Sequence, residues 1–205
     1  MDNDAIAQRR LLLASDNPGK LAELRALLAP MGVRVEAQGA LGIRGAEEPH
    51  GTFVENALAK ARHAARASGW PALADDSGLC CLALDGAPGV RSARYAGENA
   101  TDAQNNARLL GQLAGSTDRR AHYHCVVVAM HGGDDPEPLI ADGRWDGEIV
   151  DVPQGSGGFG YDPHFWIPGL GCTAATLDAH RKNRISHRGI AMRALAALLR
   201  ERWGW

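Results

Sequence analysis

The stretch Ala74-Asp75-Asp76-Ser77-Gly78-Leu79 is the part of the sequence from which the fold is best predicted. Its two adjacent carboxylates follow residues 71–74, a short apolar run that predicts the end of a β-strand. Because neighbouring side chains of a strand point to opposite faces, at most one aspartate faces a given cleft while the chain stays extended. Ser77-Gly78 predicts a turn. A carboxylate at the carboxyl end of a strand lies where open α/β sheets bind ligands, although such a pattern alone is more often a solvated turn.

The composition excludes several classes of protein. The 205 residues are 45% hydrophobic and 22% charged, with a net charge of −2, as expected of one large globular domain or two lobes. No long basic run supports nucleic-acid binding, and no apolar run is long enough to span a membrane. The four cysteines form no CxxC pair, so we expect reduced thiols in a cytoplasmic protein. Residues 1–10 are polar, and we expect a flexible N-terminal segment there.

A strand, a polar loop and a helix are predicted near the start of the chain. Residues 11–14 form an apolar run typical of a buried strand, and leucines then recur at helical spacing. Asn17 is a good N-cap and Pro18 suits the first helical position, so Lys20 lies in the first turn. Backbone N–H groups, the helix dipole and the ammonium there could bind an anion. The P-loop spacing is missing, and a solvated lysine at an ordinary strand–loop–helix joint is the simpler alternative.

A second helix is predicted from the capping box at Thr52 and Glu55 to about Ala67. Asn56 and Lys60 are four residues apart and therefore share a helix face. The usual alternative for Lys60 is a solvated lysine on an amphipathic helix.

Further elements follow in the second half of the chain. A capping box at Thr101 opens a helix to about residue 113, and residues 122–131 contain the β-branched run of a buried strand. Residues 139–140 and 145–150 are predicted as separate strands, with Asp146-Gly147 as a turn. Ser186 is expected to cap a last helix whose buried stripe is Ile190, Ala194, Leu195, Leu198 and Leu199.

Two polar segments could bind the flat part of a ligand. Residues 155–163 are the densest glycine segment, and glycines let a backbone approach a ligand closely while Phe159 and Tyr161 could cover a ring. A glycine-rich bulge before a strand is the alternative. Lys182, His187 and Arg188 lie at the entrance of the last helix, where they could bind anions or ring oxygens or merely decorate the surface.

Six motifs in series resemble the inosine/xanthosine triphosphate pyrophosphatases. They are SDNPGK, TFVENALAKA, ADDSGL, PGVRSARYAG, GGFGYDPHF and SHR, in the family's order over roughly residues 11 to 200. The resemblance implies an elongated α/β fold with a long mixed sheet, flanking helices and two lobes around a central cleft. Residues 11–205 would then form a single domain. It also implies Mg²⁺, a homodimer, and hydrolysis of ITP, dITP and XTP to the monophosphate and pyrophosphate.

The same resemblance implies roles for particular residues. Asp76 would be the catalytic acid residue and Glu48 a metal ligand beside it, while Ser77 would touch the nucleotide. The phosphates would be held by Lys60 and by Ser15, Asp16, Asn17, Pro18, Gly19 and Lys20. The base would be held by Phe159, Gly160, Tyr161, Asp162, Lys182, His187 and Arg188. Because a directly bound metal lowers the pKa of its carboxylate ligand, Asp76 acts either as the base or as a metal ligand. Asp75 could act as a helper.

Two departures from the family's pattern bear on the site. Pro49-His50 stands where the family usually has Thr-Gly, which leaves the loop beside Glu48 open, and Thr176 stands where the family often has Glu. Two other classes are alternatives: a Maf-like septum protein acting on other nucleotides, and a nucleotide-binding protein without catalysis. A Maf-like protein would leave the SHR segment unexplained. A binding protein without catalysis is disfavoured by the presence of Asp76, Lys20 and Lys60.

Overall fold

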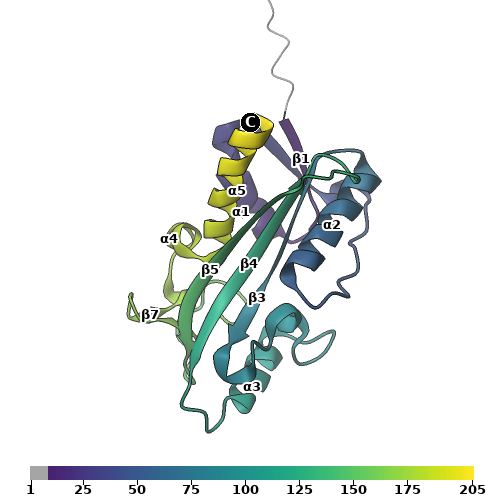
Figure 1. Ribbon diagram of the computed structural model, residues 1–205. Helices are drawn as coiled ribbons and strands as arrows, with labels where there is room; N and C mark the ends of the chain where they lie inside the picture. Colours follow the sequence, from purple (N-terminus) through teal and green to yellow (C-terminus); the bar gives the residue numbers. More distant parts are fainter. Residues whose placement is uncertain (1–8) are drawn as a thin grey trace, which may run out of the picture. The chain divides into compact units, whose positions relative to one another are not determined.

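The structure, a computed structural model, describes residues 9–205, so residues 1–8 of the predicted N-terminal segment lie outside the described part. Arg9 and Arg10, expected in that flexible segment, are instead the first two residues of a β-strand. The strands and helices are drawn in Figure 1. In chain order they are β1 (Arg9–Leu13), α1 (Pro18–Leu28), β2 (Val33–Ala37), α2 (Phe53–Ser68), β3 (Ala72–Cys81), α3 (Asp102–Gln112), β4 (Arg120–Met130), β5 (Leu139–Ile149), β6 (Phe165–Ile167), β7 (Cys172–Thr173), α4 (Ala179–Ile185) and α5 (His187–Trp203).

The strands of the described residues form one seven-stranded sheet in the order β2-β1-β3-β4-β5-β6-β7. β1 pairs in parallel with both β2 and β3, whereas β6 pairs antiparallel with β5 and β7. Parallel pairs need crossover helices, and α1 and α2 are those crossovers. The predicted α/β class with a mixed sheet and flanking helices is confirmed.

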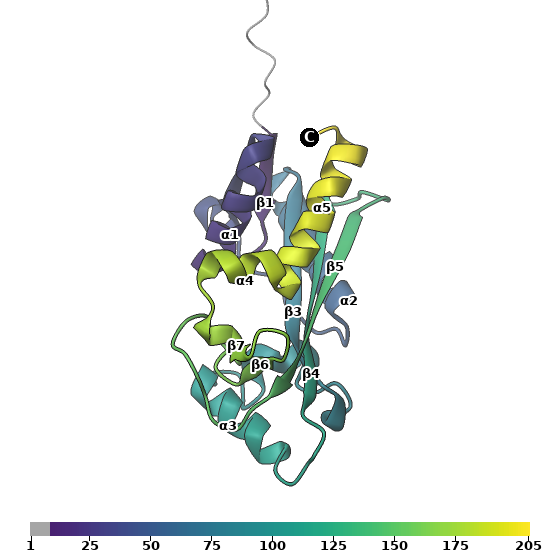
Figure 2. The ribbon, with the colours of Figure 1, turned by 90° about the vertical axis from the view of Figure 1, so that its left-hand side faces the viewer.

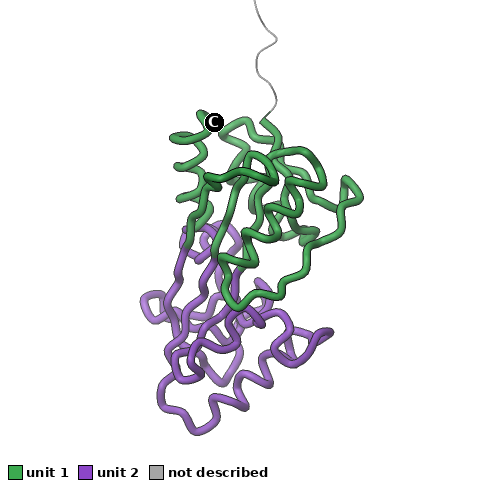
Figure 3. Tube along the Cα trace, turned by 45° about the vertical axis from the view of Figure 1, so that its right-hand side comes forward, with its two compact units in different colours: residues 1–76, 126–142, 191–205 green, residues 77–125, 143–190 purple. Residues whose placement is uncertain are grey.

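The chain divides into two compact units, which are coloured separately in Figure 3. Unit 1 contains residues up to Asp76, Val126–Asp142 and Ala191–Trp205, and unit 2 contains Ser77–Cys125 and Gly143–Ile190. The boundary in β3 therefore falls between Asp76 and Ser77, inside the ADDSGL motif.

In unit 1, α2 packs on one face of the sheet while α1 and most of α5 lie on the other (Figures 1 and 2). The α2 face is built from small side chains that let the helix lie close to the strands. Its core includes Leu12, Ala14, Ala57, Ala61, Ala64, Ala72 and Ala74. Gly69, with φ of 69°, ends α2 in the left-handed conformation that glycine adopts readily.

The core of unit 2 is more aromatic than the α2 face of unit 1. It contains Leu79, Tyr95, Leu109, Tyr123, Trp145, Ile149, Tyr161 and Phe165. These side chains come from the second half of β3, from α3 and from the strands and loops that follow, so unit 2 carries its own hydrophobic interior.

Three local predictions were wrong. β3 does not end at Ala74 but continues to Cys81, because Leu79 and Cys81 keep the period of two by burying their side chains. β5 is one strand through Asp146-Gly147: a Cβ on Gly147 would lie 2.5 Å from the Trp166 carbonyl oxygen, so this glycine permits close packing rather than a turn. Ala194 is exposed on α5, and Ala191, Met192 and Ala196 are buried beside Leu195 and Leu199 instead.

Candidate functional site

Asp75 and Asp76 lie inside β3 and point to opposite faces of the sheet, as strand geometry requires. Asp76 has the same parity as Ala72 and Ala74, which face α2, and it binds a lysine of α2. Asp75 binds Lys20 of α1 on the other face, with 2.7 Å between the Lys20 Nζ and the Asp75 Oδ1. Each of the two neighbouring carboxylates therefore has a lysine of its own from a different helix.

The Lys60 ammonium lies between two carboxylates. Its Nζ is 3.0 Å from the Asp76 Oδ1 and 2.7 Å from the Glu48 Oε1. The Asn56 Nδ2, one helical turn before Lys60, donates to the Asp76 Oδ2 at 3.3 Å. The side chains of Lys60 and Asp76 are 10% and 11% exposed, and that of Glu48 is 30% exposed. Asn56 and Lys60 share one helix face, as predicted, and both therefore bind the Asp76 carboxylate.

This arrangement shifts the ionisation of its members. Burial raises the pKa of Asp76, and the nearby negative charge of Glu48 adds to the rise against the opposing charge of Lys60. Burial works against the Lys60 ammonium, yet the charges of Asp76 and Glu48 and the hydrogen bond to Glu48 raise the pKa of Lys60 above its usual value. The ammonium is therefore held charged between its two acidic partners.

The loop before α1 is arranged around Asn17, which caps the helix as predicted. Its Oδ1 accepts from the backbone N–H groups of Gly19 and Lys20 at 2.9 and 3.1 Å, and the Asn17 N–H donates to the Ser15 Oγ. Asp16 accepts from the Gly39 N–H at 2.7 Å. These groups already bond within unit 1, so an anion here would meet the Lys20 ammonium rather than the amides that the sequence analysis assigned to it.

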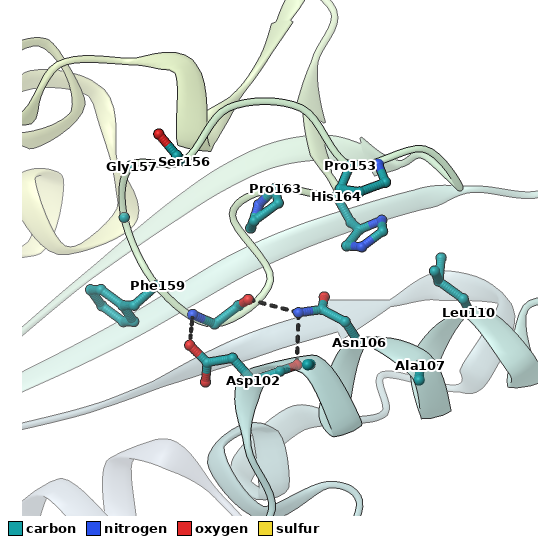
Figure 4. A pocket seen from close by; sticks show the side chains of 13 residues that line it. Asp102, Asn106, Ala107, Leu110, Pro153, Ser156, Gly157, Phe159, Pro163 and His164 are labelled. Carbon is teal, nitrogen blue, oxygen red and sulfur yellow. Dashed lines mark hydrogen bonds between the residues drawn. The ribbon is translucent and has the colours of Figure 1, made fainter.

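In unit 2, the glycine-rich loop is held by α3. The Gly160 N–H donates to the Asp102 Oδ2 at 2.6 Å, and the Asn106 Nδ2 donates to the Gly160 carbonyl oxygen at 2.9 Å (Figure 4). The loop and α3 line an open cavity of about 480 Å³, whose wall includes Phe159. A Cβ on Gly158, where φ is 74°, would lie 2.0 Å from the Asp162 Oδ2, so the loop needs glycine at this position.

Asp162 is the centre of the predicted base-binding residues. Its side chain is 3% exposed. It accepts from the Lys182 Nζ in a short ion pair, from the Phe159 N–H at 2.9 Å and from the Tyr123 hydroxyl at 3.3 Å. Asp162 therefore positions Lys182 and the loop, and little of its carboxylate is left for direct contact with a ligand.

Phe159 offers a flat aromatic face flanked by cations. Phe159 as a whole residue is 52% exposed to solvent. The Lys182 Nζ lies 4.9 Å and the Arg188 Cζ 5.7 Å from the ring centroid, within the range of cation–π contacts. Arg188 also donates to the Ser77 Oγ at 3.2 Å. Tyr161, predicted as a second cover for a ring, is instead buried and donates its hydroxyl to the Ser92 carbonyl oxygen at 2.8 Å.

Tyr123 of β4 connects the two segments predicted to bind the base, and nothing in the sequence indicated this position. Its ring stacks on His187, with 4.6 Å between centroids and 9° between planes, while its hydroxyl bonds to Asp162. Burial and the charge of Asp162 hold the pKa of Tyr123 well above its usual value, so the phenol stays protonated and can donate. An aromatic residue in an alternating strand is usual in a core, so no local signal distinguished it.

Comparison with known proteins places this geometry in a family. Residues 11–198 match the Ham1 family. The chain belongs to the Ham1 family. Over 195 residues it is 63% identical to the dITP/XTP pyrophosphatase of Ralstonia nicotianae, a match that covers 94% of this chain and 97% of the relative.

Solved structures agree with this assignment. A HAM1 protein from Coxiella burnetii superposes with a TM-score of 0.90 at 50% identity, covering 94% of this chain and 99% of the other. The nucleoside-triphosphatase / dITP/XTP pyrophosphatase from Mycobacterium abscessus gives 0.73 at 38% identity, covering 95% and 97%. The Maf-like alternative is set aside by the Ham1 match.

Two negative findings concern the described part of this Ham1 chain. Among residues 9–205, no three histidine, cysteine, aspartate or glutamate side chains form a group that could hold a metal ion. No helix there combines the length and the apolar character needed to cross a membrane. None of the four cysteines forms a disulfide, as expected, although only Cys81 and Cys125 are buried.

Proposed function

We propose that this chain is a nucleoside-triphosphate pyrophosphatase that hydrolyses dITP, XTP and ITP to the monophosphate and pyrophosphate. The observation that carries the proposal is the buried Lys60 ammonium shared by Glu48 and Asp76, in a chain 63% identical to a dITP/XTP pyrophosphatase. Such a cluster supplies both the carboxylate oxygens and the cation that hydrolysis of a polyanionic phosphoanhydride requires.

The phosphates are assigned to the lysines of unit 1. The ammonium groups of Lys20 and Lys60 form ion pairs with Asp75 and Asp76 of β3, at 2.7 and 3.0 Å respectively. Each ammonium has three N–H donors, so both keep further donors for phosphate oxygens. Lys20→Ala and Lys60→Ala should weaken a triphosphate more than a monophosphate, because each removes a charge-assisted contact of about 1.5–3 kcal/mol. Equal losses for both ligands would place the lysines away from the outer phosphates.

The residues present fit Mg²⁺ as the cofactor. Mg²⁺ binds through one or two carboxylates, substrate phosphates and several waters, and Glu48 and Asp76 present two hard oxygen donors around one buried position. When bound there, Mg²⁺ would supply Lewis-acid polarisation and lower the pKa of a coordinated water. Asp76 would hold the metal or accept the proton of the attacking water. Asp75 is the counter-ion of Lys20 and would keep that lysine oriented.

The base is assigned to unit 2. Phe159 offers a stacking face, while Lys182 and Arg188 offer N–H donors beside it. Inosine and xanthosine carry an oxygen at C6, whereas adenosine carries an amino group, so a site of donors leaves a buried donor unpaired against adenosine. We therefore expect ITP, dITP and XTP to be preferred over ATP. Preference over GTP requires that the site reject the 2-amino group.

A substrate panel with and without Mg²⁺ tests the proposal. Initial rates for dITP, XTP, ITP, ATP and GTP, with pyrophosphate as the measured product, should show metal-dependent turnover of the first three. Orthophosphate as the first product would assign a different bond. Binding of dITP without turnover would instead favour the nucleotide-binding protein without catalysis. A cytoplasmic homodimer is part of the proposal, and the free thiols support that compartment.

A further inference from the structure

The buried ammonium of Lys60 occupies the oxygens that a divalent cation would need. The Lys60 Nζ contacts the Glu48 Oε1 at 2.7 Å and the Asp76 Oδ1 at 3.0 Å. The second oxygen of Asp76 accepts from the Asn56 amide at 3.3 Å. The acidic pair is therefore already neutralised in part by a side chain of the protein.

A metal ion and the Lys60 ammonium are competitors for this pair. If both stayed on the same two carboxylates, charges of +2 and +1 would lie within a few ångströms in a largely buried place, where repulsion is strong. Among the described residues no third acidic, histidine or cysteine ligand joins Glu48 and Asp76 to compensate. Asp75 cannot serve, because it lies on the other face of β3 with Lys20.

A triphosphate removes this conflict. Its oxygens are additional ligands for the metal, and they are also anionic partners to which a long, flexible lysine side chain can turn. We propose that Lys60 is the resident counter-ion of Glu48 and Asp76, that it must leave them when the metal binds, and that it thereby makes binding of metal and triphosphate cooperative. This inference rests on the proposed assignment of Glu48 and Asp76 as metal ligands.

The test measures Mn²⁺ binding to the nucleotide-free protein by the electron paramagnetic resonance signal of free Mn²⁺. Lys60→Met keeps an unbranched side chain only one atom shorter and removes the charge, so it should bind Mn²⁺ about tenfold more tightly than the wild type. In EDTA, the same variant should bind inorganic tripolyphosphate more weakly. A variant that merely lost structure would bind both ligands less well.

Lys20→Met is the matched control. It removes the same charge from the neighbouring carboxylate, Asp75, but leaves the Glu48–Asp76 pair occupied. Its affinity for Mn²⁺ should stay within about threefold of the wild type, the effect of a more distant charge. The inference is overturned if Lys60→Met binds Mn²⁺ no more tightly than the wild type, or if Lys20→Met gains as much.

Two further variants keep the result interpretable. If Lys60→Met folds poorly, Lys60→Gln serves in its place, because it retains an N–H donor without the charge. It should show the same gain in Mn²⁺ affinity. Adding Glu48→Gln to Lys60→Met should reverse the gain. If the double variant still bound Mn²⁺ tightly, the metal assignment in the proposed function would be wrong, whereas a failure of the single variants alone would refute only the exchange.

Discussion

Phe159 allows stacking of the base to be separated from recognition of its edge. Phe159 is 52% exposed to solvent. The Lys182 Nζ lies 4.9 Å and the Arg188 Cζ 5.7 Å from the centroid of its ring. Stacking of a base on an aromatic side chain contributes roughly 1–3 kcal/mol, so Phe159→Leu should raise KM by about 5- to 150-fold. Every base has a π-face. The loss should therefore be similar for ITP and ATP, and their ratio of kcat/KM should change by less than about threefold.

Arg188→Ala should have the opposite signature. It removes N–H donors and leaves the ring, so the ratio of kcat/KM for ITP to that for ATP should fall by about one order of magnitude, the cost of one unpaired buried group. Val152→Ala, at a residue that is 70% exposed in the same unit, controls for loss of surface apolar area. Coupled pyrophosphate release with both substrates is the assay. If Phe159→Leu reduced only the ITP rate, or left KM unchanged, the ring would not be a stacking platform.

Five further substitutions test other parts of the site and fold. Asp76→Asn should lose several powers of ten in kcat, whereas Asp75→Asn should mainly raise KM; the reverse result would exchange their roles. Because burial and Glu48 raise the pKa of Asp76, its ionised form costs folding free energy as pH rises through that pKa, so the Tm of Asp76→Asn relative to that of the wild type should rise from acid pH to pH 8. Tyr123→Phe should raise KM for ITP a few-fold with kcat unchanged, since it removes only the hydroxyl bond to Asp162; an equal fall in kcat would argue against a positioning role. Gly147→Ala should destabilise by about 1–3 kcal/mol through overpacking, whereas Gly111→Ala, inside α3 with no atom nearby, should stabilise by about 0.5–1 kcal/mol, as thermal melts would show.

Local signals predicted much of the lysine and carboxylate cluster of unit 1. Asn17, Pro18 and Thr52 start α1 and α2 where the sequence predicts, and Lys20 and Lys60 follow at fixed distances from those caps. Helix starts are set by a few adjacent residues, so they can be recognised without knowledge of the rest of the fold.

The glycine-rich loop could not be predicted in the same way. Tyr161 turns inward because Asp102 and Asn106 of α3 hold the adjacent Gly160. These residues are 58 and 54 positions away in the sequence. The partner of Tyr161, the Ser92 carbonyl oxygen, is 69 positions away. Aromatic and glycine content indicates a loop that can approach a ring, but only distant contacts decide which aromatic side chain stays exposed.

The conformation at Gly147 is likewise decided by contacts that the local sequence does not show. Asp-Gly is a common turn signal, yet here the sheet continues because Phe165 and Trp166 pack against the backbone where a Cβ would otherwise stand. Charged residues occupy alternate, exposed positions of β5 from Asp142 to Glu148, but two of the buried positions between them are Gly143 and Gly147, which carry no apolar side chain to indicate a strand. A packing constraint from β6 therefore overrode a local preference.

The extension of β3 beyond Ala74 explains how two adjacent aspartates can take different parts in one reaction. In a turn, both carboxylates could have faced the same side and competed for one cation. In a strand they cannot, and α1 and α2 lie on opposite faces to supply Lys20 and Lys60 separately. A shift of β3 by one residue would exchange the two faces, placing Asp76 against α1 and removing it from Glu48. The alternation of the strand, more than the identity of either carboxylate, thus places Asp76 beside Glu48, as the proposed metal pair requires, and leaves Asp75 as the partner of Lys20.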